Sequence, residues 1–460
     1  MIFLIFSSIE FLLWFLPIFL IVYGITPRKY RNLTLLVGSI VFYARGDVRY
    51  LPLLMISILC NYFLGLHLAK RSPKTLWRKK LLLILTLGAN LAVLLWFKDW
   101  GGSAGLPLGI SFYTFQILSY QIDVYRGEVS REYSFLKFAT YVSMFPKLIS
   151  GPITRYGDIS DSLTERTFTV RGLEDGMKLF ILGLAAKVLL ADRVGILWHE
   201  VQVTGFESIS TPLAWLAAIA YSMEIYFDFW GYSLMAMGLG RMMGIELPAN
   251  FRRPYMARSV RDFYRRWHMT LGQWFCRYVY IPLGGSRQGE LRTIFNLLVV
   301  WMLTGIWHGA GWNFLFWGLW FAFFLILEKL FLGDILESVP KVFGRIYTLA
   351  VVLISWVFFA LESPGEILAY LQAMFGMNGI GPVNSLAMFL CNEYLVLLVI
   401  ALVACLPLGS RLVHALKSSK TGPAMALYRL GEKVIPAVLL LLSVAYIVDA
   451  SYNPFLYFRF

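Results

Sequence analysis

Long apolar segments are the feature that most limits what this chain can fold into. Residues 81–97 and 386–408 each have about the length that a helix needs to cross a bilayer core, roughly 20 residues. Charged residues make up only 15% of the 460-residue chain, against about 25% in soluble domains. In lipid, segments this continuous are stable only as helices, which pair their own backbone polar groups. The sequence therefore predicts an all-α polytopic membrane protein.

Apolar segments recur along the whole chain and predict about ten to thirteen transmembrane helices in a single domain, residues 1–460. Some segments are short or carry charges, and we expect these to be re-entrant or interfacial helices. No internal repeat or soluble domain is visible, and the first predicted span lacks the features of a cleavable signal. The predicted spans are 1–25, 32–44, 51–69, 81–98, 106–124, 134–150, 173–198, 212–240, 293–332 (two helices), 346–361, 386–408 and 434–450.

The basic loops predict the orientation of the chain. Loops 28–31 and 70–80 are rich in Lys and Arg and lie two predicted spans apart, so they share one face of the membrane. Cytoplasmic loops carry an excess of these residues. We therefore expect this face in the cytoplasm, the N-terminus outside, and loop 99–105 facing out.

Positive charge is concentrated in one stretch. The net charge is +14, and between residues 241 and 292 there are ten arginines and three acidic residues, a local excess of seven. A basic cytoplasmic loop alone explains such an excess. Arginine also binds phosphates with its planar fork, so an anionic ligand on this face is the other interpretation.

Two histidines carry the strongest indication of chemistry. His308 lies in an apolar helix whose flanking segments, 294–303 and 314–327, have no charged residue. An ionisable side chain inside a membrane span is a functional-site hypothesis, and a neutral imidazole can accept a proton from an attacking hydroxyl. A histidine hydrogen-bonded to a neighbouring helix is the alternative.

His268 lies in a stretch of aromatic residues and arginines, 262–280, where apolar residues at helical spacing predict an interfacial amphipathic helix. It could therefore be a functional or a merely interfacial histidine. Asp228 is an acidic residue in an apolar stretch, and it needs a buried partner, for which we expect an arginine of 252–266. No pair of histidines has the spacing of zinc ligands, and the four cysteines show no CxxC motif, so no metal site is predicted.

Several motifs in order resemble the membrane-bound O-acyltransferase (MBOAT) family, in particular the membrane subunit of bacterial alginate and peptidoglycan O-acetylation systems. They cover nearly the whole chain: 106–127, 145–156, 226–244, 250–255, 262–275, 305–318 and 453–460. The resemblance implies a ring of helices around a central tunnel. It also implies that His308 is the general base and His268 a second active-site residue.

The resemblance gives roles to further residues. The donor, expected to be acetyl-CoA on the cytoplasmic side, would be held by Arg252, Arg253, Arg265, Arg266 and Trp267. Structural or tunnel-lining roles fall to Asp228, Trp307 and Asn313. No bound cofactor is expected, since acetyl-CoA would be a substrate.

The function implied is O-acetylation of a cell-surface or secreted polysaccharide, in the inner (plasma) membrane of a bacterial cell. An extracytoplasmic hydrolase-like acetyltransferase or acceptor protein is the expected partner, besides the acyl donor and membrane lipid; no nucleic acid is expected. Transfer of D-alanine from a carrier protein to teichoic acid is an alternative enzyme activity. A polysaccharide-precursor transporter is the alternative of another class.

Overall fold

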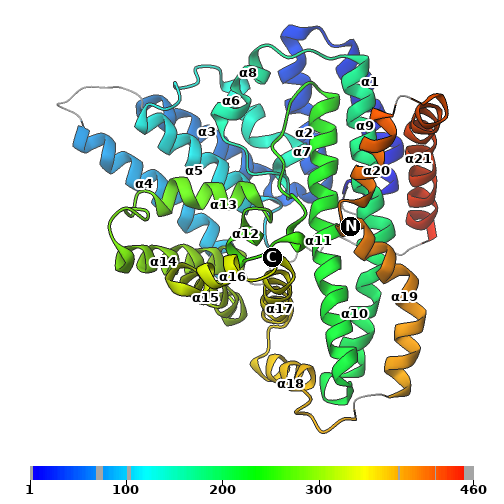
Figure 1. Cartoon of the computed structure of the whole chain (residues 1–460). Coiled ribbons are helices and arrows are strands. Elements are labelled where there is room, and N and C mark those ends of the chain that lie inside the picture. The colour runs from blue at the N-terminus through cyan, green and yellow to red at the C-terminus, as the bar shows by residue number, and fades with distance from the viewer. Residues whose placement is uncertain (1–3, 69–75, 101–104, 382–383, 420, 450–460) are drawn as a thin grey trace. The chain divides into compact units, whose positions relative to one another are not determined.

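The computed structural model describes residues 4–68, 76–100, 105–381, 384–419 and 421–449 (Figure 1). Every regular element within these ranges is a helix, which confirms the predicted all-α fold class. Loop 99–105, the basic loop 70–80 and the terminal motif 453–460 lie wholly or partly outside the described residues.

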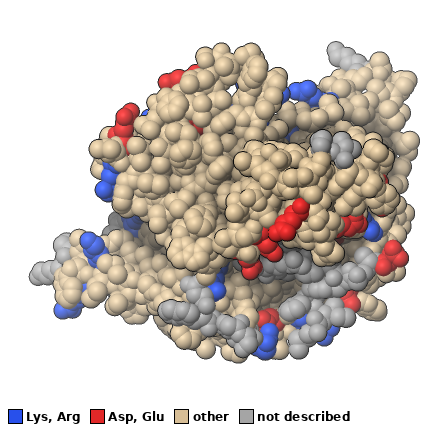
Figure 2. All heavy atoms as spheres, turned by 90° about the horizontal axis from the view of Figure 1, so that it is seen from below, with Lys and Arg blue, Asp and Glu red and all other residues tan. Residues whose placement is uncertain are grey.

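Seven helical segments of the described chain are long and apolar enough to cross a membrane, so the chain is a multi-pass membrane protein. They are Arg28–Leu68, Leu76–Lys98, Glu290–His308, Trp312–Ser338, Lys341–Ala360, Ser385–Cys405 and Gly422–Asp449. The other predicted spans form helices that are shorter, interrupted or less apolar. Large apolar side chains such as Trp14 and Phe389 are exposed, as lipid contact requires, and Figure 2 shows a face on which uncharged surface predominates.

The described chain forms two compact units, each considered by itself. The first contains described residues within 1–184 and 232–249. Its helices are α1 (Leu16–Ile25, after a π-helical turn Phe11–Phe15), α2 (Arg31–Asp47), α3 (Leu51–Leu68), α4 (Leu76–Leu95), α5 (Ile110–Arg126), α6 (Phe135–Ser143), α7 (Phe145–Leu148), α8 (Tyr156–Thr164), most of α9 (Val170–Ala185) and the end of α11 (Thr211–Met242). Its core is aromatic: the ring centroids of Phe6 and Phe11 are 4.9 Å apart, and those of Phe42 and Phe145 are 5.5 Å apart.

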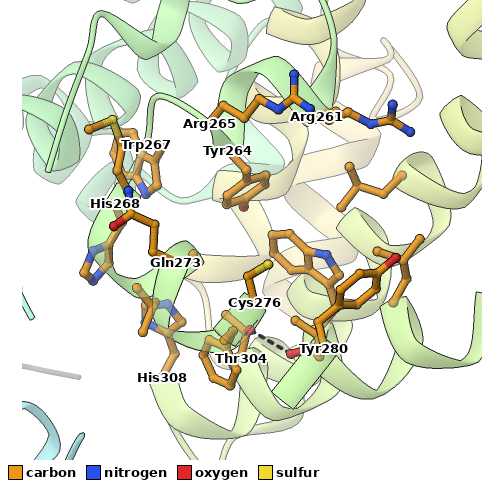
Figure 3. Close-up of a pocket in the computed structure, with 18 of the residues that line it drawn as sticks. Arg261, Tyr264, Arg265, Trp267, His268, Gln273, Cys276, Tyr280, Thr304 and His308 are labelled. Atoms are coloured by element: carbon orange, nitrogen blue, oxygen red, sulfur yellow. Dashed lines mark hydrogen bonds between the residues drawn. The ribbon is translucent and has the colours of Figure 1, made fainter. Parts of the chain in front are cut away.

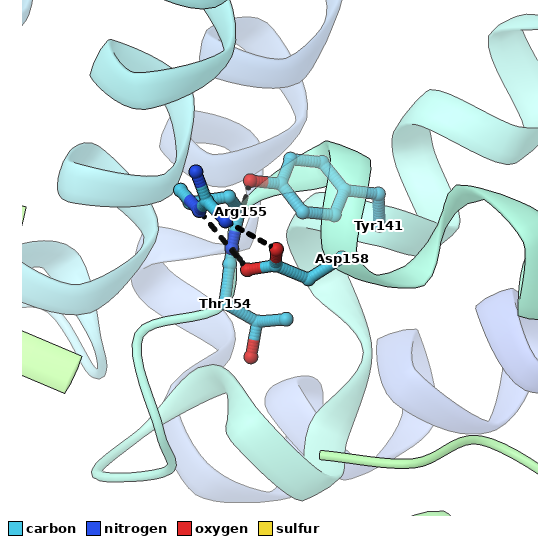
Figure 4. Close-up of polar contacts among 4 residues, drawn as sticks. All are labelled: Tyr141, Thr154, Arg155 and Asp158. Atoms are coloured by element: carbon cyan, nitrogen blue, oxygen red, sulfur yellow. Dashed lines mark hydrogen bonds and ion pairs between the residues drawn. The ribbon is translucent and has the colours of Figure 1, made fainter. Parts of the chain in front are cut away.

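The predicted span 134–150 is interrupted. Met144 adopts a non-helical conformation, with φ −55° and ψ 119°, between the nine-residue α6 and the four-residue α7. The chain that follows is held by polar contacts, shown in Figure 4. The Tyr141 hydroxyl donates a hydrogen bond to the Thr154 carbonyl oxygen at 3.0 Å, and Arg155 pairs with Asp158 at 2.6 Å. Neither short helix is long enough to cross a bilayer.

The second unit contains residues 185–231 and 250–449, and it carries both histidines of interest. Its helices are α10 (Asp192–Thr204), the first part of α11, α12 (Val260–Tyr264), α13 (Met269–Phe275), α14 (Glu290–His308), α15 (Trp312–Leu327), α16 (Gly333–Ser338), α17 (Lys341–Ala360), α18 (Pro364–Met374), α19 (Ser385–Cys405), α20 (Leu408–Ser418) and α21 (Gly422–Asp449). The stretch 262–280 is not the single amphipathic helix predicted. It is divided into α12, a break at residues 265–268, α13 and a π-helical turn, Cys276–Tyr280.

Candidate active site

His308 ends the first helix of a tight antiparallel pair, α14 and α15. A Cβ on Gly305 would lie 2.5 Å from the carbonyl oxygen of Phe314, and one on Gly318 would lie 2.4 Å from that of Trp301. Any larger residue would push the backbones apart at these two positions, so the glycines allow the helices to pack closely. The short turn at residues 309–311 then fixes His308 next to the start of α15.

Aromatic rings surround His308. The side chain is buried, and its ring centroid lies 4.8 Å from that of Trp307, 4.9 Å from that of Trp317 and 5.1 Å from that of Phe359. Apolar surroundings exclude water and strengthen any hydrogen bond made inside them. The imidazole of His308 therefore lies among apolar rings, where a hydrogen bond to a bound group would be strong.

His268 is held in an unusual backbone conformation at the start of α13. Its φ of 42° and ψ of 53° fall in the left-handed region, which costs a non-glycine residue about 1 kcal/mol or more. Two backbone hydrogen bonds join this break to the chain before it: Met269 N–H donates to the Asn250 carbonyl oxygen, and Arg252 N–H donates to that of Arg266, both at 2.9 Å. These bonds hold the imidazole at a defined place.

The hydrogen bonds of Asn250 determine which nitrogen of His268 carries the proton. The Asn250 Oδ1 atom accepts from the backbone N–H and the hydroxyl of Thr270, at 3.3 and 2.7 Å, so it is an acceptor. His268 Nδ1 lies 3.3 Å from the same oxygen and must therefore donate, which leaves Nε2 as the acceptor nitrogen of the neutral ring. Burial lowers the pKa of His268 to about 3, so the ring is neutral at pH 7.

Both histidines line one cavity of about 420 Å³. Figure 3 shows His268 and His308 along one side of it, and Arg261 and Arg265 at another edge, with Tyr264 next to Arg265. Most of the remaining wall is aliphatic or aromatic. The cavity therefore combines an apolar chamber, two imidazoles and a basic edge.

A second cavity, of about 760 Å³, shares Arg261 and Arg265 with the first. Its wall also carries Arg258 and Lys341. Two of its carboxylates already have partners: Asp262 pairs with Arg266 at 2.8 Å, and Glu328 accepts the backbone N–H groups of Val260 and Arg261. Glu337 is the third carboxylate of this wall, so the second cavity is polar, with its two shared arginines where it adjoins the first.

The structure places some of the residues predicted to bind the donor at the first cavity and others away from it. Arg265 and Trp267 line the cavity that holds the histidines. Arg252 is exposed and lines neither cavity, Arg253 donates to the Ser410 hydroxyl on α20 at 2.5 Å, and Arg266 pairs with Asp262.

Other lining residues were missed by the sequence analysis: Arg261, Tyr264, Gln273, Cys276, Tyr280 and Thr304. Arg261 precedes Arg265 by four residues. Because residues four apart share a helix face, this spacing is a signal that could have identified it.

Asp228, Trp307 and Asn313 occupy three different environments. Asp228 is buried and pairs with Lys187 at 2.7 Å, so the predicted arginine partner from 252–266 is wrong. The centroid of the Trp307 ring lies 4.8 Å from that of the His308 ring and 6.1 Å from that of the His268 ring, so Trp307 packs beside both imidazoles. Asn313 is buried in the first turn of α15. Among the described residues, no three metal-ligating side chains come together.

Comparison with known proteins agrees with these features. A model of the MBOAT, membrane-bound O-acyltransferase family, matches residues 66–364. The chain is 36% identical over 493 residues to the probable alginate O-acetylase AlgI of Pseudomonas putida, covering 99% of this chain and 100% of the relative. It is 34% identical over 431 residues to the peptidoglycan O-acetyltransferase of Helicobacter pylori, covering 82% and 81%. A more distant relative, the teichoic acid D-alanyltransferase of Streptococcus thermophilus, is 28% identical over 242 residues, or 49% of this chain and 57% of the relative. The chain belongs to the membrane-bound O-acyltransferase family and is an acyltransferase.

Proposed function

We propose that this protein moves acetyl groups from cytoplasmic acetyl-CoA across a bacterial inner membrane for O-acetylation of a cell-surface or secreted polysaccharide. The observation that carries the proposal is that His268, His308, Arg261 and Arg265 line one cavity. Imidazoles suit proton transfer, and guanidinium groups suit the phosphates of the donor. The 34–36% identity to relatives named as O-acetylating enzymes, over most of the chain, supports acetyl as the acyl group.

His308 is the general base in this proposal. It takes the proton of the attacking hydroxyl while the oxygen bonds to the acyl carbon, and it returns the proton to the departing thiolate of CoA. His268 serves the reaction differently, because a group with a pKa of about 3 is a poor proton acceptor at pH 7. Its neutral Nε2 can still accept a hydrogen bond and so orient the hydroxyl.

The two adjoining cavities suit the two ends of a CoA thioester. The apolar cavity can hold the acyl group and the thioester, and the basic cavity can hold phosphates through Arg258, Arg261, Arg265 and Lys341. Arg261 and Arg265 border both, so they would contact the donor where it passes from one cavity to the other. The excess of arginine in residues 241–292 supports placing this side in the cytoplasm. The basic loops 28–31 and 70–80 support an N-terminus outside.

Charge reversal at these shared positions tests the donor site. We expect Arg261→Glu and Arg265→Glu each to raise the KM for acetyl-CoA about tenfold or more, because a lost charge-assisted hydrogen bond costs about 1.5–3 kcal/mol. The wild-type KM should itself rise with ionic strength, since exposed phosphate contacts are screened. The measurement is initial rate against acetyl-CoA concentration at two salt concentrations.

Arg252→Glu is the matched control, because Arg252 is exposed and borders neither cavity. Its KM should stay close to that of the wild type. Equal KM values in all three variants, unaffected by salt, would show that the arginines determine membrane topology and not donor binding.

The final acceptor is expected to be reached through an extracytoplasmic hydrolase-like acetyltransferase or acceptor protein. The test is reconstitution of the purified chain in liposomes with labelled acetyl-CoA, added outside the vesicles in one set and enclosed in them in another. Each set is measured with polymer alone, with the partner alone and with both. We expect label on the polymer only when the partner is present. Efficient labelling of polymer by the chain alone would remove the need for a partner. If the protein used a D-alanyl carrier protein and did not use acetyl-CoA, the result would favour the alternative activity, transfer of D-alanine to teichoic acid.

A further inference from the structure

One face of α15 carries two polar side chains whose hydrogen-bonding atoms have no partner within the described part of the chain. Asn313 and Trp317 are four residues apart and therefore share a face of the helix. The Trp317 ring lies 4.9 Å from the His308 ring and lines the cavity of both histidines. Asn313 lies one turn closer to the start of the helix. Its Oδ1 is 2.2 Å from the place of a Cβ on Gly311, so its side chain folds back over the turn that follows His308.

Both side chains are buried and lack hydrogen-bond partners among the described residues. Asn313 and Trp317 are each 2% exposed, and neither the Asn313 amide nor the Trp317 Nε1–H makes a hydrogen bond there. A buried polar group left unsatisfied costs about 1–3 kcal/mol. Trp320, on the same helix, shows the ordinary arrangement, because its Nε1–H donates to the Val351 carbonyl oxygen at 3.0 Å. The two unused groups, of which Trp317 packs against the His308 ring, thus need an explanation that Trp320 does not.

The start of α15 adds to the same region. The N-cap residue, Gly311, has no side chain to cap the helix, and its carbonyl oxygen accepts the N–H of Phe314 at 3.1 Å, so the first turn offers the N–H groups of Trp312 and Asn313 and not that of Phe314. These N–H groups and the helix dipole favour negative charge at an N-terminus. With the Asn313 amide, they form a set of donors next to the residue that would act as the base.

We propose that Asn313 and Trp317 donate the hydrogen bonds that stabilise the oxyanion of the acyl-transfer reaction. The inference rests on the proposed function. The hydroxyl oxygen bonds to the thioester carbon, His308 takes the hydroxyl proton, and the carbonyl electron pair moves onto oxygen. The Trp317 N–H and the Asn313 amide N–H bind that oxyanion. When the carbonyl re-forms, the C–S bond breaks, and the thiolate leaves with the proton returned by His308.

The polar groups of the cavity wall other than Trp317 fit this role less well. The Thr304 hydroxyl already donates to the Val300 carbonyl oxygen at 2.7 Å. Tyr264 lies beside Arg265, at the edge of the cavity assigned to the donor phosphates (Figure 3). Trp317 alone combines contact with the His308 ring, a place in the cavity wall and a donor without a partner among the described residues.

The test compares Trp317→Phe, Asn313→Ala and Asn313→Asp in steady-state acetyl transfer. Loss of one oxyanion donor typically lowers kcat about 10²- to 10³-fold. We expect that loss in Trp317→Phe and Asn313→Ala, with the KM for acetyl-CoA within about twofold of the wild type. Asn313→Asp keeps the shape but adds negative charge, so it should be slower than Asn313→Ala.

Two controls separate this role from packing. Trp320→Phe loses the bond to Val351, and Asn296→Ala loses the bond from its amide to the Gly285 carbonyl oxygen. Both should lose thermal stability and keep kcat. If Trp317→Phe does not fold, the kcat values of the two Asn313 variants test the inference, which expects Asn313→Asp to be slower than Asn313→Ala. Folded Asn313 variants with wild-type kcat, beside an inactive His308→Ala, would overturn this inference and leave the proposed function intact. A wild type that does not transfer acetyl groups would overturn the proposed function itself.

Discussion

We expect the His308→Ala variant to transfer acetyl groups about 10²- to 10⁴-fold more slowly than the wild type, while it inserts and folds normally. This is the usual effect of removing a general acid–base group. The side chain is buried among aromatic rings that remain when it is shortened. Purified protein in detergent should therefore show a thermal midpoint near that of the wild type, and the turnover number measures the loss.

The control for this variant is His414→Ala, because His414 is an exposed histidine on α20, outside the cavity. Its turnover should be unchanged. A His308→Ala protein with near-wild-type turnover would exclude His308 as the base. His268 would then be a poor candidate for the general base, because a pKa of about 3 makes its imidazole a weak proton acceptor.

The same pKa predicts the pH profile. Burial lowers the pKa of His268, so its ring stays neutral at every pH above about 4 and does not titrate between pH 5 and 8. If the rate falls as the pH is lowered from 8 to 5, this acid limb of the pH profile must then come from the titration of another group. His268→Gln should lower the rate and leave the midpoint of the limb where it is in the wild type. A shift of the midpoint in this variant would assign the limb to His268.

The sequence predicted those features that depend on residue type and local context. Apolar length predicted the all-α membrane fold. The two histidines were identified because ionisable groups are costly in apolar surroundings, and the structure places both at one cavity. The interruption of span 134–150 was not predicted, although Pro146, which favours the first turn of a new helix, is a local signal for it.

Contacts between distant residues could not be predicted in this way. The spacing of Trp267, Leu271 and Trp274 favours a continuous helix, but the chain breaks at residues 265–268, where its backbone bonds to Asn250 and Arg252. Helical periodicity carries no information about such pairing. In the same way, the sequence showed that Asp228 needs a partner but not that Lys187, 41 residues earlier, provides it.

Removal of the Lys187 charge should have the largest effect on stability. Lys187 lies in the π-helical turn Ala186–Ala191, and its Nζ is 2.6 Å from Asp192 and 2.7 Å from Asp228. The side chains of Lys187 and Asp228 are each 3% exposed. Removing one member of a buried ion pair costs about 3–5 kcal/mol, because the remaining charge has no counterion. We expect Lys187→Met to lower the thermal midpoint strongly and to reduce the yield of folded protein.

The surface pair of Lys178 and Glu174 provides the matched control. Its atoms are 2.7 Å apart, but the side chains are 26% and 61% exposed, so Lys178→Met should cost only about 0.3–0.5 kcal/mol. A similar change in both variants would show that the Lys187 charge is not buried as the structure places it. Restoration of the midpoint by Lys187→Met with Asp228→Asn would identify the unpaired carboxylate as the cause.

The pair also connects stability to the active site. Asp228 is followed by Phe229, whose ring packs perpendicular to the His268 ring with centroids 4.7 Å apart. An unpaired Asp228 carboxylate in the core would displace the segment of α11 that carries this ring, and Asp228→Asn removes that charge. The double variant Lys187→Met with Asp228→Asn should therefore recover both its thermal midpoint and its turnover. If it recovers the thermal midpoint but not the turnover, the Lys187–Asp228 pair itself, and not only the fold, positions His268.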